Sequence, residues 1–244
     1  MFNKKNTNKI EFIAQFKSYY DTYPLPYPAS TTVPEWYKKQ EKYWGNVDRV
    51  KDVLPKNGQI NTTIKSCMPV FDAMTAGYYI PLQSDVKIGQ DQFGKIQTSW
   101  STTLGEVISS HNIEQYDSYQ DIDFNKYNSN ALKWENPWVV RTPPGYSSLF
   151  IHPMHYDNLP FRCFSGIVDT DKYPLPVNFP FFIEKGFNGY IECGTPVIQV
   201  IPFKRDDWKP DFSFDENLYK EWNKVRLHFS NKYKRFIRQE KSWK

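Results

Sequence analysis

The chain has 244 residues and a formal net charge of +4, and 18% of its residues are aromatic. This length suffices for one large β domain, or for one domain with appended arms, around a sizeable core. The charge is too small to indicate a nucleic-acid partner by itself, because a basic footprint must be clustered. No apolar run approaches the ~20 residues that span a bilayer, and no apolar segment follows the first lysines, so we expect neither a membrane helix nor a signal peptide.

Three cysteines, Cys67, Cys163 and Cys193, lie far apart and form no CxxC pair. An odd and sparse set of this kind predicts reduced, buried thiols rather than a disulfide framework. Cys163 and Cys193 both fall within predicted strands, where a free cysteine behaves as a small apolar residue. A cytoplasm-like compartment is therefore expected.

The first 60 residues predict an extended arm and one short helix. Residues 10–16 favour a first strand. Four prolines between residues 23 and 34 force extended backbone, which predicts an arm that wraps the surface without regular structure. A proline followed by an early glutamate predicts a helix over residues 34–44.

Residues 61–212 are expected to form the core domain. Between residues 142 and 205, short apolar runs alternate with proline, glycine and asparagine about every ten residues, which is typical of an all-β sandwich or barrel. Earlier in this region, a helical turn ending at Gly77 precedes a strand, and the polar residues 111–130 predict a surface loop. Further strands are predicted at residues 78–82, 86–88, 94–100, 132–134 and 138–141.

Residues 213–244 differ from the rest, because no proline or glycine follows residue 210. Ser213 and Glu216 resemble a capping box and predict an amphipathic helix over residues 215–237. From residue 220 onward there are nine Lys or Arg and two Glu, which indicates either a solvated face or a partner surface. The apolar side chains expected to make contacts are Leu218, Trp222, Val225, Phe229 and Phe236. The predicted fold is thus a mainly β sandwich with a proline-rich N-terminal arm and a C-terminal helix.

Asp169 and Asp171 are candidate catalytic residues. On a strand, their spacing places both on one face, where they could hold a metal, pair with Lys or Arg, or act as a base. Tyr173 lies beside them as a candidate ligand contact. The alternative is a turn at the end of a strand, in which aspartate caps backbone donors.

His155 and Asp157 are candidate metal ligands, because they match the HxD spacing that begins a two-His-one-carboxylate iron site. Completing that site needs a distal histidine, and the only later one, His228, falls within the predicted helix. The alternative is that both are ordinary loop residues. The sequence contains no GxGxxG, Walker-type or nucleophile-elbow motif, and no cofactor is predicted.

Five strings distributed between residues 28 and 208 are PASTTVPEWYK, IKSCMPVFDAMTAGYYIPL, NPWVVRTPPGYSSLF, FSGIVDTDKYPLPVNFPF and GTPVIQVIPFKRDDW. In these strings the chain resembles a family of tailed-phage and bacterial proteins known as a domain of unknown function. The resemblance implies a phage-encoded or phage-associated protein without an assigned activity, located in the host cytoplasm, the virion or both.

The strings GIVDTDKY and IECGTPVIQVIPF are similar to a strand pattern of dUTPases and dCTP deaminases. This local resemblance implies a β-clip-like or jelly-roll-like sandwich. It matches Asp169 to the base- or sugar-binding aspartate, with Asp171 and Tyr173 beside it. The chain departs from that family because residues 146–149 lack the Arg-Ser-Gly phosphate-binding segment and no glycine-rich C-terminal arm is present. These departures argue against nucleotide hydrolysis.

The leading expectation is a non-enzymatic virion structural or assembly component, because arms and terminal helices bury apolar surface on neighbouring subunits. Its expected partners are further copies of itself or virion proteins. Nucleic acid at the basic C-terminus is less favoured, and no membrane partner is expected. The first alternative is a nucleotide- or metabolite-binding, dUTPase-like protein that uses Asp169, Asp171 and Tyr173. The second is an iron-dependent oxygenase that uses His155 and Asp157.

Overall fold

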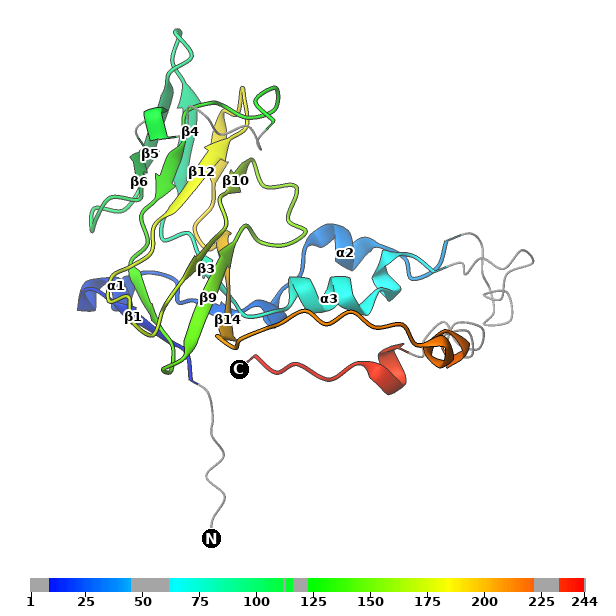
Figure 1. Cartoon of the computed structure of the whole chain (residues 1–244). Coiled ribbons are helices and arrows are strands. Elements are labelled where there is room, and N and C mark those ends of the chain that lie inside the picture. Colours follow the sequence, from blue (N-terminus) through cyan, green and yellow to red (C-terminus); the bar gives the residue numbers. More distant parts are fainter. Residues whose placement is uncertain (1–8, 45–61, 112, 116–122, 222–232, 244) are drawn as a thin grey trace. The chain divides into compact units, whose positions relative to one another are not determined.

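The computed structural model describes residues 9–44, 62–111, 113–115, 123–221 and 233–243 (Figure 1). These residues form a mainly β fold in which antiparallel strands build several sheets, as in a β-sandwich. The predicted fold class is therefore confirmed. No helix in this part of the chain is long and apolar enough to cross a bilayer.

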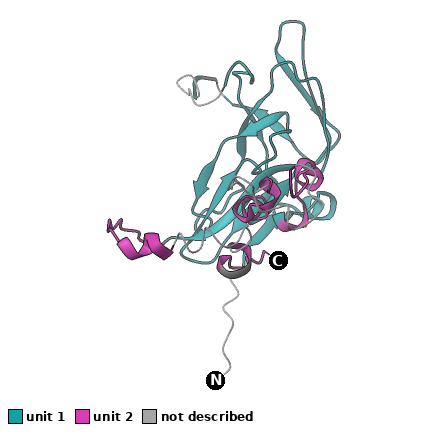
Figure 2. Ribbon diagram, turned by 90° about the vertical axis from the view of Figure 1, so that its right-hand side faces the viewer, with its two compact units in different colours: residues 1–29, 77–205 teal, residues 30–76, 206–244 magenta. Residues whose placement is uncertain are grey.

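The chain divides into two compact units (Figure 2). The first comprises residues 1–29 and 77–205 and contains the sheets. The second comprises residues 30–76 and 206–244, so it is built from two stretches that the strands of the first unit separate in the sequence. The predicted domain boundary after residue 60 lies outside the described residues.

The largest sheet of the first unit has β14 at its centre, paired with β9 on one side and β3 on the other. Gly77 leads into β3 with a φ of +67°, and a Cβ atom there would lie 2.0 Å from the carbonyl oxygen of Val200. This position therefore requires glycine. In spatial order the strands are β11 (Gly166–Val168), β9 (Tyr146–Ile151), β14 (Pro196–Lys204), β3 (Tyr78–Pro81) and β2 (Tyr27–Pro28).

Three smaller antiparallel sheets complete the first unit. The strands expected near residues 78, 86, 94, 132 and 138 are all present, including the hairpin of β4 and β5. The four-stranded sheet contains β10 (Phe161–Cys163), β12 (Phe179–Ile183), β7 (Leu132–Trp134) and β6 (Ile108–Ser110). The others contain β13 (Gly189–Ile191), β4 (Val86–Gln90) and β5 (Ile96–Trp100), and β1 (Glu11–Ala14) with β8 (Trp138–Arg141).

Aromatic rings join these sheets into one core. Trp134 of β7 stacks on Phe181 of β12, with ring centroids 4.1 Å apart. Phe150 of β9 meets Phe179 of β12 at 5.7 Å between ring centroids. Because β9 and β12 belong to different sheets, this contact packs one layer on the other. Both pairs lie among buried residues of the largest hydrophobic cluster, and rings of this size dominate core energetics.

The proline-rich stretch corrects the sequence-based prediction of a surface arm without regular structure. β2 pairs with β3 at the edge of the largest sheet, and Tyr23 and Ala29 on either side of β2 are buried. Proline is tolerated on an edge strand because it need not donate a ladder hydrogen bond on its outer side. A short helix, α1 (Lys17–Thr22), precedes this stretch and was not predicted.

The second unit contains short helical elements. α2 (Glu35–Lys39) is shorter than predicted, because Gln40 already has extended backbone. η3 (Ile64–Ser66) leads to α3 (Met68–Met74), the helical turn expected before Gly77. Two further 3₁₀ turns of the chain are η1 (Ala29–Thr31) and η4 (Ile113–Gln115).

The predicted C-terminal helix begins where expected. Residues 216–221 are helical, and the carboxylate of Asp215 caps them by accepting from the backbone N–H groups of Asn217 and Leu218. The cap is thus Asp215 rather than Ser213. Residues 222–232 lie outside the described part of the chain, and η5 (Tyr233–Ile237) is a single π-helical turn.

The predicted surface loop at residues 111–130 is anchored near its end. Tyr127 is only 8% exposed and forms an isolated β-bridge with Glu184. It packs in a small hydrophobic cluster with Ala131 and Phe182. The described end of this polar stretch therefore contributes to the core of the first unit.

Candidate functional site

Asp169 and Asp171 lie in a turn directly after β11, which we call the acidic turn (residues 169–173). The backbone N–H groups of Lys172 and Tyr173 both donate to the carbonyl oxygen of Asp169, at 2.8 and 2.9 Å. The strand ends at Val168. Of the two arrangements left open by the sequence, the structure places these residues in the turn rather than on the strand.

The guanidinium group of Arg205 contacts both aspartates of the acidic turn. Its Nη1 and Nη2 atoms donate to the two carboxylate oxygens of Asp171 at 2.9 and 2.6 Å, and Nη1 lies 3.2 Å from Oδ1 of Asp169. The N–H of Gly145 also donates to Asp171, at 2.8 Å. The hydrogen bond from Arg205 and that from Gly145 lower the pKa of Asp171 to about 2, because both favour the charged carboxylate.

Hydroxyl groups attach the acidic turn to β9. Ser147 donates to Oδ1 of Asp169 at 2.6 Å. Behind it, the hydroxyl of Thr170 is hydrogen-bonded to those of Thr142 and Ser148, at 2.7 and 2.9 Å. The side chain of Asp171 is only 1% exposed. The acidic turn thus forms a clasp between strands, and the buried carboxylate is already occupied by protein donors.

The candidate metal ligands His155 and Asp157 lie in the loop between β9 and β10, where His155 has a left-handed φ of 64°. Among the described residues, no group of three or more His, Cys, Asp and Glu side chains is placed to hold a metal ion. His228, the remaining ligand of the predicted iron site, lies outside the described residues.

The same loop contains the half-buried His152, which the sequence did not single out as a site. Its Nδ1 accepts from the backbone N–H of Cys163 at 3.4 Å, and its ring packs edge-on against Phe161. Burial is the main cause that lowers the pKa of His152 to about 4. This side chain is therefore neutral near pH 7 and packs against Phe161 of the core.

The cysteines differ in their environments. Cys163 is buried in β10, where its Sγ donates to the carbonyl of Val197 at 3.2 Å and burial raises its pKa. A thiol of this kind is unreactive. Cys193 was predicted to lie within a strand, which is wrong: β13 ends at Ile191, and Cys193 is exposed in the turn that precedes Gly194.

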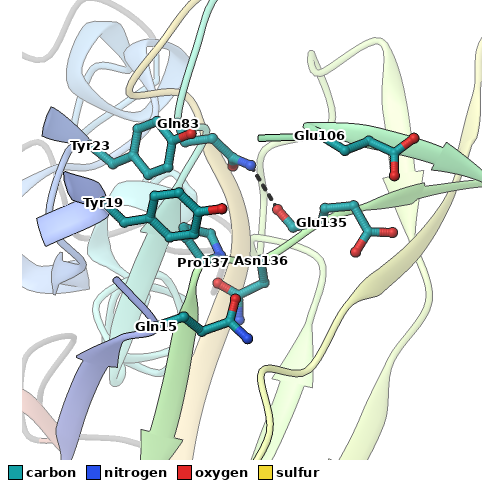
Figure 3. Close-up of a pocket in the computed structure, with 8 residues that line it drawn as sticks. All are labelled: Gln15, Tyr19, Tyr23, Gln83, Glu106, Glu135, Asn136 and Pro137. Carbon is teal, nitrogen blue, oxygen red and sulfur yellow. Dashed lines mark hydrogen bonds between the residues drawn. The ribbon is translucent and has the colours of Figure 1, made fainter. Parts of the chain in front are cut away.

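A polar pocket of about 180 Å³ lies in the first unit. Figure 3 shows Tyr19 and Tyr23 on one side of it and Glu106 and Glu135 on the other. The side-chain amide of Gln83 donates to the backbone carbonyl of Glu135 at 2.8 Å. The complete lining is Gln15, Tyr19, Tyr23, Gln83, Glu106, Glu135, Asn136 and Pro137.

The carboxylate of Glu135, a residue that lines the polar pocket, is held by its neighbours. Its Oε1 accepts from the hydroxyl of Ser109 at 2.5 Å and lies 3.0 Å from Nζ of Lys133. Its Oε2 accepts from the side-chain amide of Asn178. Both oxygens of Glu135 thus already accept from protein donors, which fixes the position of this carboxylate.

The second unit contains a larger cavity of about 420 Å³, which we call the basic-aromatic pocket. Its aromatic part comes from Tyr37 of α2 and Phe71 of α3, whose ring centroids are 6.0 Å apart. The hydroxyl of Tyr37 donates to the carbonyl of Lys65 at 3.2 Å and thereby links α2 to η3. The complete lining is Tyr37, Lys42, Lys65, Ser66, Met68, Phe71, Lys234 and Arg238.

Four cationic side chains line the basic-aromatic pocket, and one of them is neutralised. Arg238 donates from Nε and Nη2 to Oδ1 of Asp72, at 3.0 and 2.6 Å, and Lys241 contacts the other oxygen of Asp72 at 2.9 Å. These donors lower the pKa of Asp72, with Arg238 contributing most. Within the described residues, the other three cations of the lining form no ion pair. The pocket therefore carries net positive charge.

The stretch after β14, residues 206–219, exposes an unusual number of large apolar side chains; we call it the aromatic segment. Residues 206–215 of this segment have no regular structure, and residues 216–219 belong to the helix at residues 216–221 (Figure 1). The side chains of Trp208, Phe212 and Phe214 are 88%, 91% and 91% exposed. Aromatic rings are normally buried for most of their surface, so this segment has the character of an unpartnered contact surface.

The predicted contact residues of the C-terminal helix are only partly described. Leu218 is 48% exposed and belongs to the aromatic segment. Trp222, Val225 and Phe229 lie outside the described residues, as does the side chain of Phe236.

No family model, curated protein or solved structure matches this chain. The resemblance to tailed-phage proteins and the local resemblance to dUTPases therefore stay predictions from the sequence.

Proposed function

We propose that this protein is a non-enzymatic assembly component that acts through protein–protein contacts, with the aromatic segment as its contact surface. The observation that carries the proposal is the near-complete exposure of Trp208, Phe212 and Phe214. Trp and other large rings supply most of the binding energy at protein interfaces when a partner buries them.

The size of the three rings is sufficient for this role. Rings of this kind bury ~150–250 Å² each, and at ~25 cal/mol per Å² three of them correspond to on the order of 10 kcal/mol of gross hydrophobic free energy. Association costs about 4–15 kcal/mol in lost translational and rotational freedom. The rings alone thus approach that cost, and polar contacts around them set the final affinity.

The resemblance to tailed-phage and bacterial proteins supports a virion or its assembly as the setting of this function. Further copies of the chain, or virion proteins, are the proposed partners. A nucleic-acid partner for the aromatic segment is disfavoured, because residues 206–216 contain five carboxylates and one lysine, and like charge repels phosphate. Mass spectrometry of purified particles tests the virion setting separately.

The enzymatic alternatives have less support. In the acidic turn, Arg205 and Gly145 already occupy the carboxylate of Asp171, so the arrangement favours a clasp over a nucleotide site. For His155 and Asp157, the described residues supply no third ligand.

Light scattering coupled to size exclusion tests the proposal over a range of protein concentrations. The wild-type protein is expected to increase in mass with concentration, and the variant Trp208→Ala/Phe212→Ala/Phe214→Ala is expected to stay monomeric. Phe93→Ala is the matched control, because Phe93 is 85% exposed at the tip of the β4–β5 hairpin and should leave association unchanged. A wild-type protein that stays monomeric at every concentration, and that binds no virion protein, would refute the proposal.

A further inference from the structure

The aromatic segment and the basic-aromatic pocket have complementary chemistry, although both belong to the same chain. We infer that the basic-aromatic pocket of one copy receives the aromatic segment of a second copy. This inference rests on the proposed function and adds to it the surface that the segment contacts.

The basic-aromatic pocket offers an apolar surface with a cationic rim. Tyr37, Met68 and Phe71 supply rings and a thioether, and a methionine adapts its shape to an incoming aromatic group. Lys42 and Lys234 are exposed lysines of the lining and form no ion pair within the described residues. A volume of about 420 Å³ lies in the range of cavities that bind small organic groups.

The aromatic segment offers the opposite charge around rings. Its rings stand at positions 208, 212 and 214, and three of its aspartates stand at positions 207, 211 and 215. Each ring thus has an aspartate as its direct neighbour in the chain. When a ring enters the pocket, the neighbouring carboxylate lies at the mouth of the pocket, where Lys42 and Lys234 are exposed.

A second copy is the partner because the pocket of the same chain does not contain these rings. They are 88–91% exposed in this structure, which excludes their burial in any cavity of their own chain here. A second copy carries the same pocket and the same segment. Reciprocal exchange would therefore make two equivalent contacts in a symmetric dimer, whereas one-way exchange would continue into a ring or filament.

Complementation between two defective variants tests this inference. The segment variant is Trp208→Ser/Phe212→Ser/Phe214→Ser, and the pocket variant is Lys42→Glu/Lys234→Glu, which changes exposed lysines only. Each variant alone is expected to be monomeric. An equimolar mixture is expected to form a heterodimer through one intact segment and one intact pocket, at least tenfold more abundant than homodimers of either variant. Raised salt should weaken it, because the contacts at the rim are electrostatic.

A charge exchange provides the second test. Asp207→Lys/Asp211→Lys, introduced into the pocket variant, is expected to restore association to within about threefold of wild type. The substitution Lys185→Glu is the control for a general effect of charge, because Lys185 is exposed and lies outside the pocket. Circular dichroism establishes that each variant is folded.

The outcomes separate the inference from the proposed function. If the segment variant is monomeric while the pocket variant associates like wild type, the segment binds elsewhere and the inference fails, although the proposed function stands. If wild type itself neither associates nor binds a virion protein, the proposed function fails. If a free aromatic anion such as a nucleotide binds the pocket of wild type and the segment variant alike, without any association of copies, the pocket is a ligand site and the inference is overturned.

Discussion

Arg205 and Asp171, 34 residues apart in the sequence, form a two-point ion pair that fixes the acidic turn to the start of β9 and the end of β14. The same guanidinium contacts Asp169, but the two carboxylates differ in environment: the side chain of Asp169 is 62% exposed and that of Asp171 is 1% exposed. This difference makes the role of the acidic turn testable by paired substitutions.

Asp171→Asn is expected to lower the thermal stability of the protein more than Asp169→Asn. The amide keeps the size of the side chain but loses the ion pair and mismatches the donors of Arg205 and Gly145. A fall in Tm of roughly 3–8 °C is expected for Asp171→Asn, and a change below about 2 °C for the exposed Asp169. Equal shifts in differential scanning calorimetry would contradict the structural role assigned to Asp171.

The same pair predicts part of the acid sensitivity. Because the folded-state pKa of Asp171 is lowered to about 2 from an ordinary value of 3.8, the unfolded chain binds more protons between these values. The stability that Asp171 contributes is therefore present above about pH 4 and is lost as the pH falls toward about 2. Unfolding by urea at pH 2–4 is expected to depend less steeply on pH in Asp171→Asn than in wild type. An unchanged slope would count against this linkage.

His152 predicts a second and separate pH window. Burial lowers its folded-state pKa from 6.5 to about 4, so the unfolded chain binds the extra proton between these values. The stability contributed by neutral His152 is therefore fully present above about pH 6.5. It decreases by on the order of 3 kcal/mol as the pH falls toward 4. His152→Gln, which cannot ionise, is expected to lose this dependence. The test is the free energy of unfolding of wild type and His152→Gln, measured from pH 4 to 7. If the two proteins show the same dependence on pH, His152 is not the responsible group.

Gly77→Ala is expected to destabilise the first unit strongly. The added Cβ would meet the carbonyl oxygen of Val200 at 2.0 Å, in addition to the strain of a positive φ. Gly94→Ala is the matched control, since Gly94 has a φ of +77° but no atom within 4 Å of the place that the added methyl group would take. We expect a loss of about 1 kcal/mol for Gly94→Ala and at least ~3 kcal/mol for Gly77→Ala. Similar losses would mean that the approach of β14 to Gly77 is relieved by a shift of the backbone.

Local patterns were sufficient to predict several strands of the first unit. The hairpin of β4 and β5 and the strands β3, β7 and β8 follow from short apolar runs between turn residues, because that periodicity is a local property. The proline-rich stretch was predicted wrongly, since its pairing with β3 joins residues about fifty positions apart and depends on an open sheet edge. Local sequence rules predict the extended backbone that proline requires, but they do not predict which strand that backbone pairs with.

For the candidate sites too, local features could be predicted from the sequence, whereas contacts between distant residues could not. The sequence identified Asp169 and Asp171 but not Arg205, because a charge partner so far along the chain has no local signature. The basic-aromatic pocket was not predicted at all: Tyr37 and Phe71 come from one stretch of the second unit, and Lys234 and Arg238 from another. The aromatic segment did have a local signal, namely three rings that each stand directly beside an aspartate after the last strand.

Hydrogen–deuterium exchange at two protein concentrations is the decisive experiment for the role of the aromatic segment. We expect peptides covering residues 206–219 to exchange rapidly in dilute protein and to become protected in concentrated protein. Peptides of the β4–β5 hairpin, which carries the equally exposed Phe93, are expected to exchange at the same rate in both samples. Rapid exchange of residues 206–219 at both concentrations, with or without added virion proteins, would contradict a function based on contacts of the aromatic segment.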